Sequence, residues 1–586
     1  MKRKKNTRRV LPFLDWFPID GKTLKSDFVV GVTVALLLIP QSMAYAELAG
    51  MPAHYGLYAS FVPVILAAAF GHLPQIASGP TALTAIVTAS VLMPLVTGLS
   101  GEDYMEKYIQ LAILLSLVVG LVRIALSILK MATIVNFISH PVIIGFTNAG
   151  ALVICLSQMG RLIGVEGPPE NNLGFGGFLS DIFQTLGNIN NINLETLAFG
   201  LGSLTLLFLF KRFAPKLPGA LFVVFVSILL SFFLGYHQNY PEATIGLVPS
   251  GLPDFGIMEW NFVGAESQGM WLTAFKMIPA AFVVTIIGFM EVLVISKAIS
   301  IKTRQGMDLN QELKAQGIAA VGGFFCQAYP TSASVSRSAM NMEYGGKTGM
   351  ANVFAGLGVL SVLFFFTDYL AVLPKATLAA LIVMSVLSLV NFSPIFLAWK
   401  ATKSDGVAAA ATMLFTLLFA PQIIYGIIIG ALVALGMYMY RSMKPDVQIF
   451  GIDKTGLNEA EALVAQSEHI IALRFRGSLF FASMAFFESR IHDAIASQPD
   501  ASHIIVVADG INRIDASGEW GLRQLLDVLK ENSFTLAFAG LPESSKATLE
   551  RTGLVDKIGE ENFHVTLEKA INTIHDEISP VEHYMI

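Results

Sequence analysis

Apolar runs of membrane length follow one another along most of the chain. They lie at about 28–46, 55–71, 80–97, 108–128, 131–159, 195–212, 218–236, 272–298, 311–328, 350–373, 376–399, 405–420 and 422–440. A helix of about 20 apolar residues crosses the hydrocarbon core of a bilayer. The pattern therefore predicts a polytopic α-helical membrane domain over residues 28–443, preceded by a cytoplasmic segment over residues 1–27.

One polar stretch lies among these runs, between the ninth and the tenth. Residues 329–341 read YPTSASVSRSAMN, with a proline, several hydroxyls and one arginine. Irregular polar backbone occurs at membrane depth only where it lines an enclosed or water-filled cavity. We expect a short helix over residues 331–342 that starts part-way across the membrane, with Ser334, Ser336 and Arg337 in its first turns. The free N–H groups of a helix N-terminus and a fixed cation together favour an anion.

Basic residues concentrate in alternate loops. This charge pattern tests whether the polar stretch at 329–341 is a membrane segment. With a cytoplasmic N-terminus, the cytoplasmic loops carry Lys2, Lys4, Lys5, Arg8, Arg9, Lys130, Lys211, Arg212, Lys216, Lys297, Lys302, Arg304, Lys347, Lys400 and Lys403. The outer loops carry Glu102, Asp103, Glu106, Glu166, Glu170, Asp181, Glu242, Asp254, Glu259 and Glu266, with Lys107, Arg161, Lys276 and Lys375 near the outer ends. Positive charge favours the cytoplasmic side, and the alternation holds only if residues 329–341 cross or half-cross. The alternative, a cytoplasmic loop with a surface arginine, would break it, so 14 segments are predicted and the C-terminus is cytoplasmic.

A second polar interruption opens the third segment. Residues 74–84 read PQIASGPTALT and include Ser78, Gly79 and Thr81. In a seven-plus-seven arrangement, the third and tenth segments occupy equivalent positions. Matched broken helices in two halves indicate a transporter site near the bilayer midplane. A tight loop before a helix would account for one interruption, but not for two at corresponding positions.

Four motifs resemble those of the sulfate permease (SulP) family of anion transporters. They are IPQSMAYAELAGMPAHYGLYASF at 39–61, SGPTA at 78–82, GFMEVLVISKAIS at 288–300 and the polar stretch at 329–341. The resemblance runs over nearly the whole chain. It implies two inverted seven-helix repeats, with a core domain of segments 1–4 and 8–11 and a gate domain of segments 5–7 and 12–14. It also implies elevator-like movement of the core against the gate, and a homodimer.

The first segment adds two neutral donors to the candidate site. Gln41 and Tyr45 are four residues apart and share one helix face. An amide N–H and a phenol O–H suit a desolvated anion; alternatively, Gln41 satisfies a neighbouring helix and Tyr45 is core. The resemblance favours the ligand role, whereas Glu47 receives no role. The predicted anion-binding set is Gln41, Tyr45, Ser78, Gly79, Thr81, Ser334, Val335, Ser336 and Arg337.

Glu291 is an acid inside an apolar run, where a carboxylate must be paired or protonated. The resemblance places it in the core domain with Arg337, where many proton-coupled members carry an acid. Our hypothesis is that ionised Glu291 competes with the anion for Arg337, and that protonation releases Arg337 to the anion. Proton and anion binding would then favour each other reciprocally. The alternative is a static buried ion pair.

Membrane energetics favour coupled transport. At roughly 100 mV, moving a dianion into a cell costs about 4.6 kcal/mol before any concentration gradient. Proton-coupled sulfate symport is therefore the first prediction, and a bicarbonate or dicarboxylate symporter or exchanger is the alternative. An anion channel needs no titrating acid, so Glu291 argues against a channel. A regulatory scaffold acting through the C-terminal domain needs no half-helix anion site, so Ser334 and Arg337 argue against a scaffold. Sodium coupling needs a cluster of oxygen ligands that no spacing identifies.

Composition supports these predictions. Of 586 residues, 54% are hydrophobic and 14% are charged, and the net charge is −5. Both cysteines, Cys155 and Cys326, lie in apolar runs, and the ten histidines show no metal-ligand spacing. With no nucleophile–base constellation either, we expect no enzyme activity, no cofactor, no metal and no nucleic-acid partner. The expected partners are a small anion, protons and the lipids of a cell (inner) membrane.

Beyond residue 443 the chain becomes charged and its apolar stretches shorten. Strands at 469–481, 503–510 and 535–541 alternate with helices at 484–497, 518–532 and 544–558, which indicates an α/β domain over residues 444–586. It resembles the cytoplasmic STAS domain of the same family, which is similar to bacterial anti-sigma-factor antagonists. In those proteins a phosphorylated serine follows the aspartate that matches Asp515, whereas this chain has Ala516, so we expect dimer contacts, trafficking or regulation. Ser517 is a candidate cap for the following helix.

Overall fold

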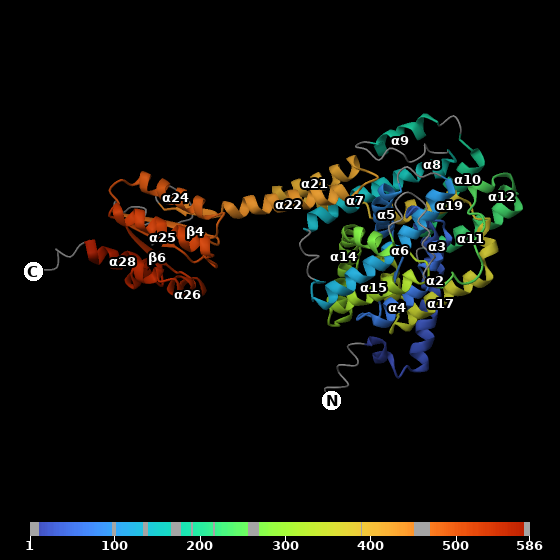
Figure 1. The fold of residues 1–586 in the computed structure, drawn as a ribbon, viewed down its shortest axis with the longest axis horizontal. Coiled ribbons are helices and arrows are strands. Elements are labelled where there is room, and N and C mark those ends of the chain that lie inside the picture. Colours follow the sequence, from blue (N-terminus) through green and yellow to red (C-terminus); the bar gives the residue numbers. More distant parts are fainter. Residues whose placement is uncertain are drawn as a thin grey trace, which may run out of the picture. The chain divides into compact units, whose positions relative to one another are not determined.

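The computed structural model describes residues 11–96, 101–132, 139–165, 177–188, 192–214, 217–255, 269–387, 389–450 and 469–578 (Figure 1). The chain divides into two compact units, Met1–Ala434 and Leu435–Ile586. Several of the predicted loop charges lie outside the described residues: Lys2, Lys4, Lys5, Arg8, Arg9, Glu166, Glu170, Lys216, Glu259, Glu266 and the side chain of Glu102.

The first unit is helical. Within the described residues, six helical stretches are long and apolar enough to cross a bilayer by length and composition. They are α2 (Gly21–Leu48), α6 (Gly101–Ile128), α7 (His140–Ser157) with α8 (Met159–Ile163), α10 (Leu194–Phe213), α14 (Ile278–Thr303) and α22 (Ile424–Met443). The unit thus has the helical transmembrane fold predicted from the sequence.

Shorter helices make up the rest of this unit. They are η1 (Pro12–Trp16), α3 (His54–Tyr58), α4 (Val62–Phe70), α5 (Ala82–Leu92), η2 (Met93–Leu95), α9 (Gly177–Gly187), α11 (Gly219–Phe233), α12 (Tyr236–Asn239), η5 (Pro241–Ala243), α13 (Met270–Lys276), α15 (Leu309–Phe324), α16 (Val335–Glu343), α17 (Met350–Phe365), α18 (Thr367–Ala371), α19 (Lys375–Leu387), α20 (Ser393–Ala401) and α21 (Lys403–Leu418). Proline stands in the first turn of α4, α7, α14 and α20, where its missing N–H removes no helical hydrogen bond. Each predicted segment coincides with one or more helices, and the number of bilayer crossings stays a prediction.

Helix packing divides the first unit into two groups. In one group, α6 packs on α14 and α15, while α17 packs on α2 and α4. In the other, α7 packs on α21 and α19, while α10 packs on α8, α11 and α19. Contacts of α2 with α19 and α11 join the groups. The grouping agrees with the core and gate segments that the family resemblance implied.

Close backbone approach explains the tightest packing in the first group. A Cβ at Gly120 of α6 would lie 2.8 Å from the Gly317 carbonyl oxygen, and one at Gly317 of α15 would lie 2.9 Å from the Gly120 oxygen. Small residues allow helices to approach closely in membranes, where packing rather than the hydrophobic effect drives association. These two glycines therefore fix where α6 and α15 cross.

The second unit is an α/β domain. Its sheet has the order β3 (Asp446–Ile449), β4 (Ile470–Arg476), β5 (His503–Val507), β6 (Thr535–Ala539), β7 (Phe563–His564). The β3–β4 pair is antiparallel and the other pairs are parallel. The helices are α24 (Met484–Ser497), α25 (Ala516–Glu531), α26 (Glu543–Arg551), α27 (Leu554–Ile558) and α28 (Leu567–Ile578). The predicted α/β class is confirmed, whereas β3, β7 and α28 were not predicted.

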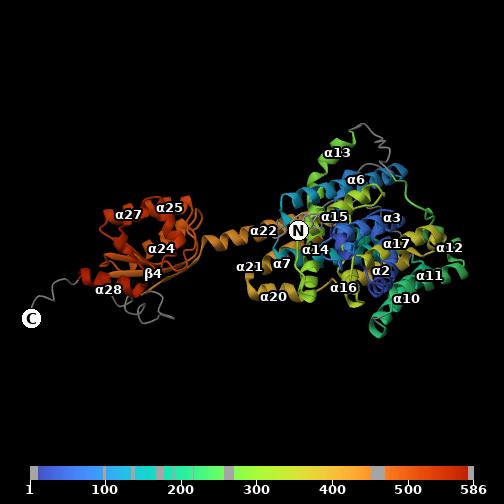
Figure 2. The same cartoon turned by 90° about the horizontal axis from the view of Figure 1, so that it is seen from below.

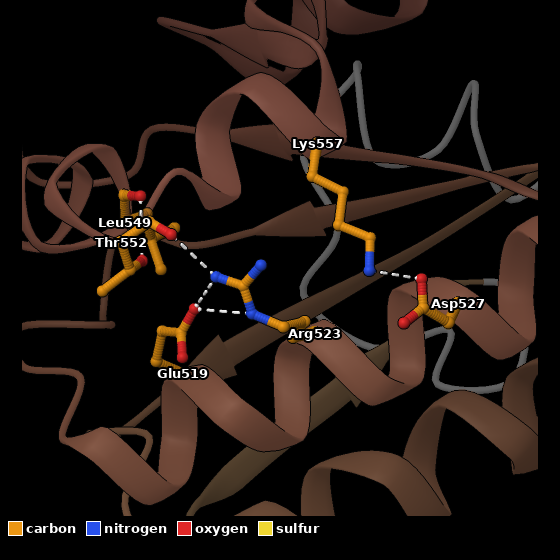
Figure 3. Close-up of polar contacts among 6 residues, drawn as sticks. All are labelled: Glu519, Arg523, Asp527, Leu549, Thr552 and Lys557. Atoms are coloured by element: carbon orange, nitrogen blue, oxygen red, sulfur yellow. Dashed lines mark hydrogen bonds and ion pairs between the residues drawn. The ribbon is translucent and has the colours of Figure 1, made fainter.

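The start of α25 differs from the sequence prediction. Asp515, not Ser517, caps this helix, because its Oδ1 accepts a hydrogen bond from the Gly518 N–H at 2.7 Å. Further along α25, Arg523 donates to Glu519 and, at 2.8 Å, to the Thr552 carbonyl oxygen (Figure 3). The ion pair between Lys557 of α27 and Asp527 also reaches α25. These contacts orient the short helices after β6 on the face of α25.

Candidate anion site

Two short extended segments pair at the centre of the candidate site. Strands β1 (Ser78–Gly79) and β2 (Ser332–Ala333) are antiparallel, with Ser78 opposite Ala333 and Gly79 opposite Ser332. Helix α5 follows β1 and α16 follows β2. We call the place where β1 and β2 pair the crossing. Since the strands run in opposite directions, α5 and α16 leave the crossing in opposite directions, and their N-termini approach each other there. The two polar interruptions, which the sequence assigned to equivalent positions in the two halves, therefore meet in the structure.

The tenth segment begins later than predicted. The expected helix over residues 331–342 is wrong at its start, because α16 begins at Val335. Residues 331–334 are extended instead, and the Ser334 N–H donates to the Ala77 carbonyl oxygen at 2.9 Å. Pairing with the third segment satisfies backbone groups that a buried irregular segment would otherwise leave unpaired.

Both helices begin with a hydroxyl cap. Thr81 Oγ1 accepts from the Thr84 N–H at 3.4 Å, and Ser334 Oγ accepts from the Arg337 N–H at 3.5 Å. The hydroxyl oxygens of these two predicted ligands therefore each accept a hydrogen bond from the backbone of their own helix. Val335 and Ser336, in contrast, are exposed at the start of α16, where first-turn N–H groups have no acceptor within the helix.

Arg337 is fully buried, with 0% of its surface exposed. Its Nη2 donates to the Pro80 carbonyl oxygen at 2.9 Å, and its Nε and Nη1 have no hydrogen-bond partner within the described part of the chain. A buried cation with unmet donors is costly unless a negative charge accompanies it. Gly79 permits this approach, because a Cβ there would lie 3.2 Å from the Arg337 Nη2.

Glu291 reaches the same crossing from α14, which lies beside α16 (Figure 2). Its Oε2 accepts from Thr81 Oγ1 at 2.9 Å. In the described structure no ion pair within 4.0 Å joins Glu291 to Arg337, although the two side chains interact electrostatically. The acid and the arginine therefore hold adjacent residues, Thr81 and Pro80, rather than each other.

The remaining predicted ligands occupy different surroundings. Tyr45 is buried in α2, within electrostatic range of Arg337 and facing the Ser385 side chain of α19. Gln41 is also buried, and its Oε1 has no hydrogen-bond partner among the described residues. Ser78 Oγ accepts from Gln316 Nε2 of α15 at 2.7 Å, which holds β1 in place.

Sequence reasoning missed one buried cation, Arg123 of α6. It is 1% exposed, and its Nη1 donates to the Thr331 carbonyl oxygen at 2.9 Å. Its Nε and Nη2 have no hydrogen-bond partner among the described residues. A lone arginine inside the apolar run at 108–128 was the available signal, and it is the same signal that singled out Arg337.

A cavity of about 860 Å³ lies elsewhere in this unit, beside the C-terminal ends of α2 and α5. None of the predicted anion-binding residues lines it. Its charged wall includes Lys375 and the ion pair between Glu47 Oε2 of α2 and Arg161 Nη1 of α8, which are 3.0 Å apart. Glu47, which had no role on sequence grounds, thus links a helix of the core to one of the gate.

Comparison with known proteins places the chain in a family. Residues 24–412 match the sulfate permease family, and residues 461–570 match the STAS domain. A probable sulfate transporter 4.2 from Arabidopsis thaliana is 30% identical over 96% of this chain and 81% of its own length. A probable sulfate transporter from Mycobacterium tuberculosis is 28% identical over 94% of this chain and 95% of its own length.

Solved structures share the fold. The murine Slc26a9 anion transporter in its inward-facing state has a TM-score of 0.86 and 20% identity, covering 98% of this chain and 95% of that one. The transmembrane domain of the cyanobacterial bicarbonate transporter BicA has a TM-score of 0.57 and 21% identity, covering 71% of this chain and 99% of that one. The relatives are named as transporters, which confirms that the chain is not an enzyme. By the extent of these matches, the chain belongs to the sulfate permease family and carries a C-terminal STAS domain.

Proposed function

We propose that this chain is a secondary active transporter that takes up a small inorganic oxyanion, most readily sulfate, together with protons. The observation that carries the proposal is Arg337, which is fully buried where two broken helices meet and has two nitrogens without hydrogen-bond partners among the described residues. Fixed donors in a poorly solvated site attract an anion far more strongly than the same donors in water.

The anion site is assigned to the start of α16 and the side chains that face it. Ser336 and the first-turn N–H groups of α16 supply neutral donors, and Arg337 supplies the positive charge. Tyr45 lies within electrostatic range of Arg337 and supplies a phenol donor from α2. Gln41 belongs to the set if α2 turns it toward the crossing in another state of the transport cycle.

Glu291 is assigned to proton coupling. Ionised Glu291 lowers the positive charge available to an anion at Arg337, and protonation restores it. The direct competition for Arg337 expected from the sequence is replaced by an electrostatic effect, because the two side chains contact neighbouring residues rather than each other. The coupling remains reciprocal, since an anion at Arg337 equally favours the protonated acid.

The wider assignments follow the predicted topology. Residues 1–27 are a cytoplasmic segment, residues 28–443 the membrane domain and residues 444–586 the cytoplasmic STAS domain. The protein lies in a cell (inner) membrane as a homodimer, and its core group of helices moves against its gate group in an elevator-like cycle. Relatives named as sulfate transporters support sulfate as the first substrate to test.

Uptake by purified protein in liposomes tests this function. Labelled sulfate and succinate are each offered with and without an inward proton gradient, and bicarbonate is offered as a competitor. Sulfate uptake should rise with the proton gradient, and an excess of unlabelled sulfate should inhibit it more than bicarbonate or succinate does. Sulfate uptake that is the same with and without the proton gradient would contradict proton coupling. Preferential uptake of succinate, or inhibition led by bicarbonate, would support the alternative substrates.

An anion channel is distinguished from a secondary active transporter by whether sulfate accumulates. A channel conducts anions down their gradient and cannot accumulate them against one. Accumulation of sulfate above its external concentration under a proton gradient, with the membrane potential clamped at zero, would exclude a channel. The absence of any anion movement through otherwise folded protein would favour a regulatory scaffold.

A further inference from the structure

Two buried arginines hold residues that face each other across the strand pair. Continuing the β1–β2 register by one residue places Pro80 opposite Thr331. Arg337 of α16 donates to the Pro80 carbonyl oxygen, and Arg123 of α6 donates to the Thr331 carbonyl oxygen, each at 2.9 Å. Each guanidinium keeps two nitrogens without a partner among the described residues. The crossing therefore contains two fixed positive charges, from two different helices.

The carboxylate of Glu291 lies with them. A Cβ at Gly288, one turn earlier on α14, would be 2.7 Å from Arg123 Nη2, and Glu291 follows on the same helix face. Both arginines interact electrostatically with Glu291. Among the described residues, the other titratable groups facing the cluster are the phenols of Tyr45 and Tyr329, which are neutral donors.

The charge of this cluster depends on the proton. Two guanidinium charges and one carboxylate sum to +1, and protonation of Glu291 raises the sum to +2. A net charge in a poorly solvated interior is costly, and an anion of equal and opposite charge removes that cost. A dianion therefore matches the protonated cluster, whereas a monoanion matches the ionised one.

We propose that Arg123 is a selectivity residue, which supplies the second positive charge that lets the core hold a dianion together with a proton on Glu291. The inference rests on the proposed transport function and deepens it. Arg123 acts through the charge of the cluster and through Thr331, without being required to touch the anion. In its absence the protonated cluster has a net charge of +1 and matches a monoanion.

The test compares labelled sulfate and labelled chloride in the same proteoliposomes. Arg123→Gln should lower the sulfate-to-chloride uptake ratio at least about tenfold, because one full charge is lost from a site that salt screens poorly. Arg123→Lys should keep most of the ratio, since it keeps the charge. Arg212→Gln, which removes an exposed arginine at the end of α10, is the matched control and should leave the ratio unchanged.

A purely structural arginine gives a different result. Equal losses of sulfate and chloride uptake in Arg123→Gln, or an unchanged ratio, would overturn the proposal. If Arg123→Gln fails to fold, the double variant Arg123→Gln/Glu291→Gln is the second test, because it leaves Arg337 and thus the same net charge of +1 that the wild-type cluster has with Glu291 ionised. The double variant should take up chloride in preference to sulfate at every pH, and a retained sulfate preference would overturn the proposal.

Binding separates this inference from the proposed function. Thermal unfolding of detergent-purified protein is followed with added sulfate or chloride, without any transport step. Greater stabilisation of the wild type by sulfate, lost in Arg123→Gln, supports the selectivity role even if the wild type transports neither anion and the proposed function fails. The same response to both anions in the wild type and the variant would overturn it.

Discussion

At the scale of residues, Arg337 and Glu291 act on consecutive positions of one turn. Arg337 holds the Pro80 carbonyl oxygen and Glu291 holds the Thr81 hydroxyl. Neither charge is neutralised by a contact ion pair with the other, so the positive field at α16 responds to the proton on Glu291. A static buried ion pair, the alternative left open by the sequence, would have contact geometry that the two side chains do not have.

Replacement of Glu291 by glutamine tests the coupling. Wild-type sulfate uptake should increase as the external pH falls, because protonation raises the positive charge of the site. Glu291→Gln fixes the neutral form, so its uptake should vary less than about twofold over the same range. Sulfate exchange without a proton gradient should persist, and initial rates in proteoliposomes measure both quantities.

Glu312→Gln provides the matched control for that change. Glu312 is another acid of the membrane unit, 1% exposed in α15, whose Oε1 accepts from the N–H groups of His72 and Leu73. A glutamine carbonyl oxygen accepts the same bonds. This variant should keep the pH dependence of the wild type. A pH profile that flattens equally in both variants would contradict a specific role for Glu291.

Gly79 should tolerate no side chain. Its φ of +138° is rare for residues with a Cβ, and a Cβ there would press on Arg337 Nη2 at 3.2 Å. Gly79→Ala should reduce sulfate uptake at least about tenfold and destabilise the protein by about 1–2 kcal/mol. Proteoliposome uptake and thermal unfolding measure the two effects. Wild-type uptake by this variant would show that the Arg337–Pro80 contact is dispensable.

At the scale of elements, helix interfaces depend on where small residues stand. The close contact of α6 with α15 places Arg123 at Thr331, because α6 carries Arg123 three residues after Gly120. The backbones approach at Gly120 and Gly317, where a Cβ on either glycine would meet backbone within 2.9 Å. The position of a charged side chain in the site thus follows from a glycine contact one helix turn away.

Gly317→Ala should therefore destabilise the membrane unit. Overpacking at a tight interface costs about 1–3 kcal/mol, and the displacement of α6 should also weaken sulfate uptake. Thermal unfolding in detergent measures the first effect. Gly202→Ala in α10 is the matched control, since a Cβ there meets nothing within 4 Å and alanine favours a helix. A Gly317→Ala variant as stable as Gly202→Ala would contradict the close contact of α6 with α15.

At the scale of the whole molecule, the Glu47–Arg161 ion pair connects the two helix groups. Glu47 belongs to α2 and Arg161 to α8, and both line the large cavity. If the core moves against the gate, this contact must open during transport. Cysteines at both positions, joined by a short bifunctional thiol reagent in a background lacking Cys155 and Cys326, should block sulfate uptake.

Reagent applied to either single cysteine variant is the control and should leave uptake within about twofold of the untreated protein. A reversible reagent should allow uptake to recover after cleavage. Full uptake by the crosslinked double variant, with crosslinking verified by mass spectrometry, would contradict relative movement of α2 and α8. Because the Arg161 side chain is partly exposed, the Glu47–Arg161 ion pair contributes only about 0–1 kcal/mol to stability.

The STAS domain should fold without the membrane unit. Its sheet buries apolar side chains on both faces, under α24 and α25 on one side and α28 on the other. Residues 444–586 expressed alone should therefore give a soluble protein with a single cooperative unfolding transition. Circular dichroism during thermal unfolding measures this, and a non-cooperative transition would contradict an independent core.

Much of the architecture was determined by the sequence alone. The period and length of apolar runs reflect the bilayer and the sheet directly, so the helical membrane unit, the α/β unit and the family were predicted from local pattern and motifs. Pro80 and the hydroxyls of the two polar interruptions also revealed their pairing. Arg337 was identified because an arginine in an apolar chain is costly wherever it lies.

Only the tertiary structure decided which groups touch. The pairing of residues 78–79 with 332–333 delayed the start of α16 to Val335, because long-range backbone pairing outweighed the local helical preference. Helix packing brought Glu291 to Thr81 rather than to Arg337, and it brought Arg123, far away in the sequence, to Thr331. Charge and burial can be read along a chain, whereas the distance between two charges depends on how separate helices pack.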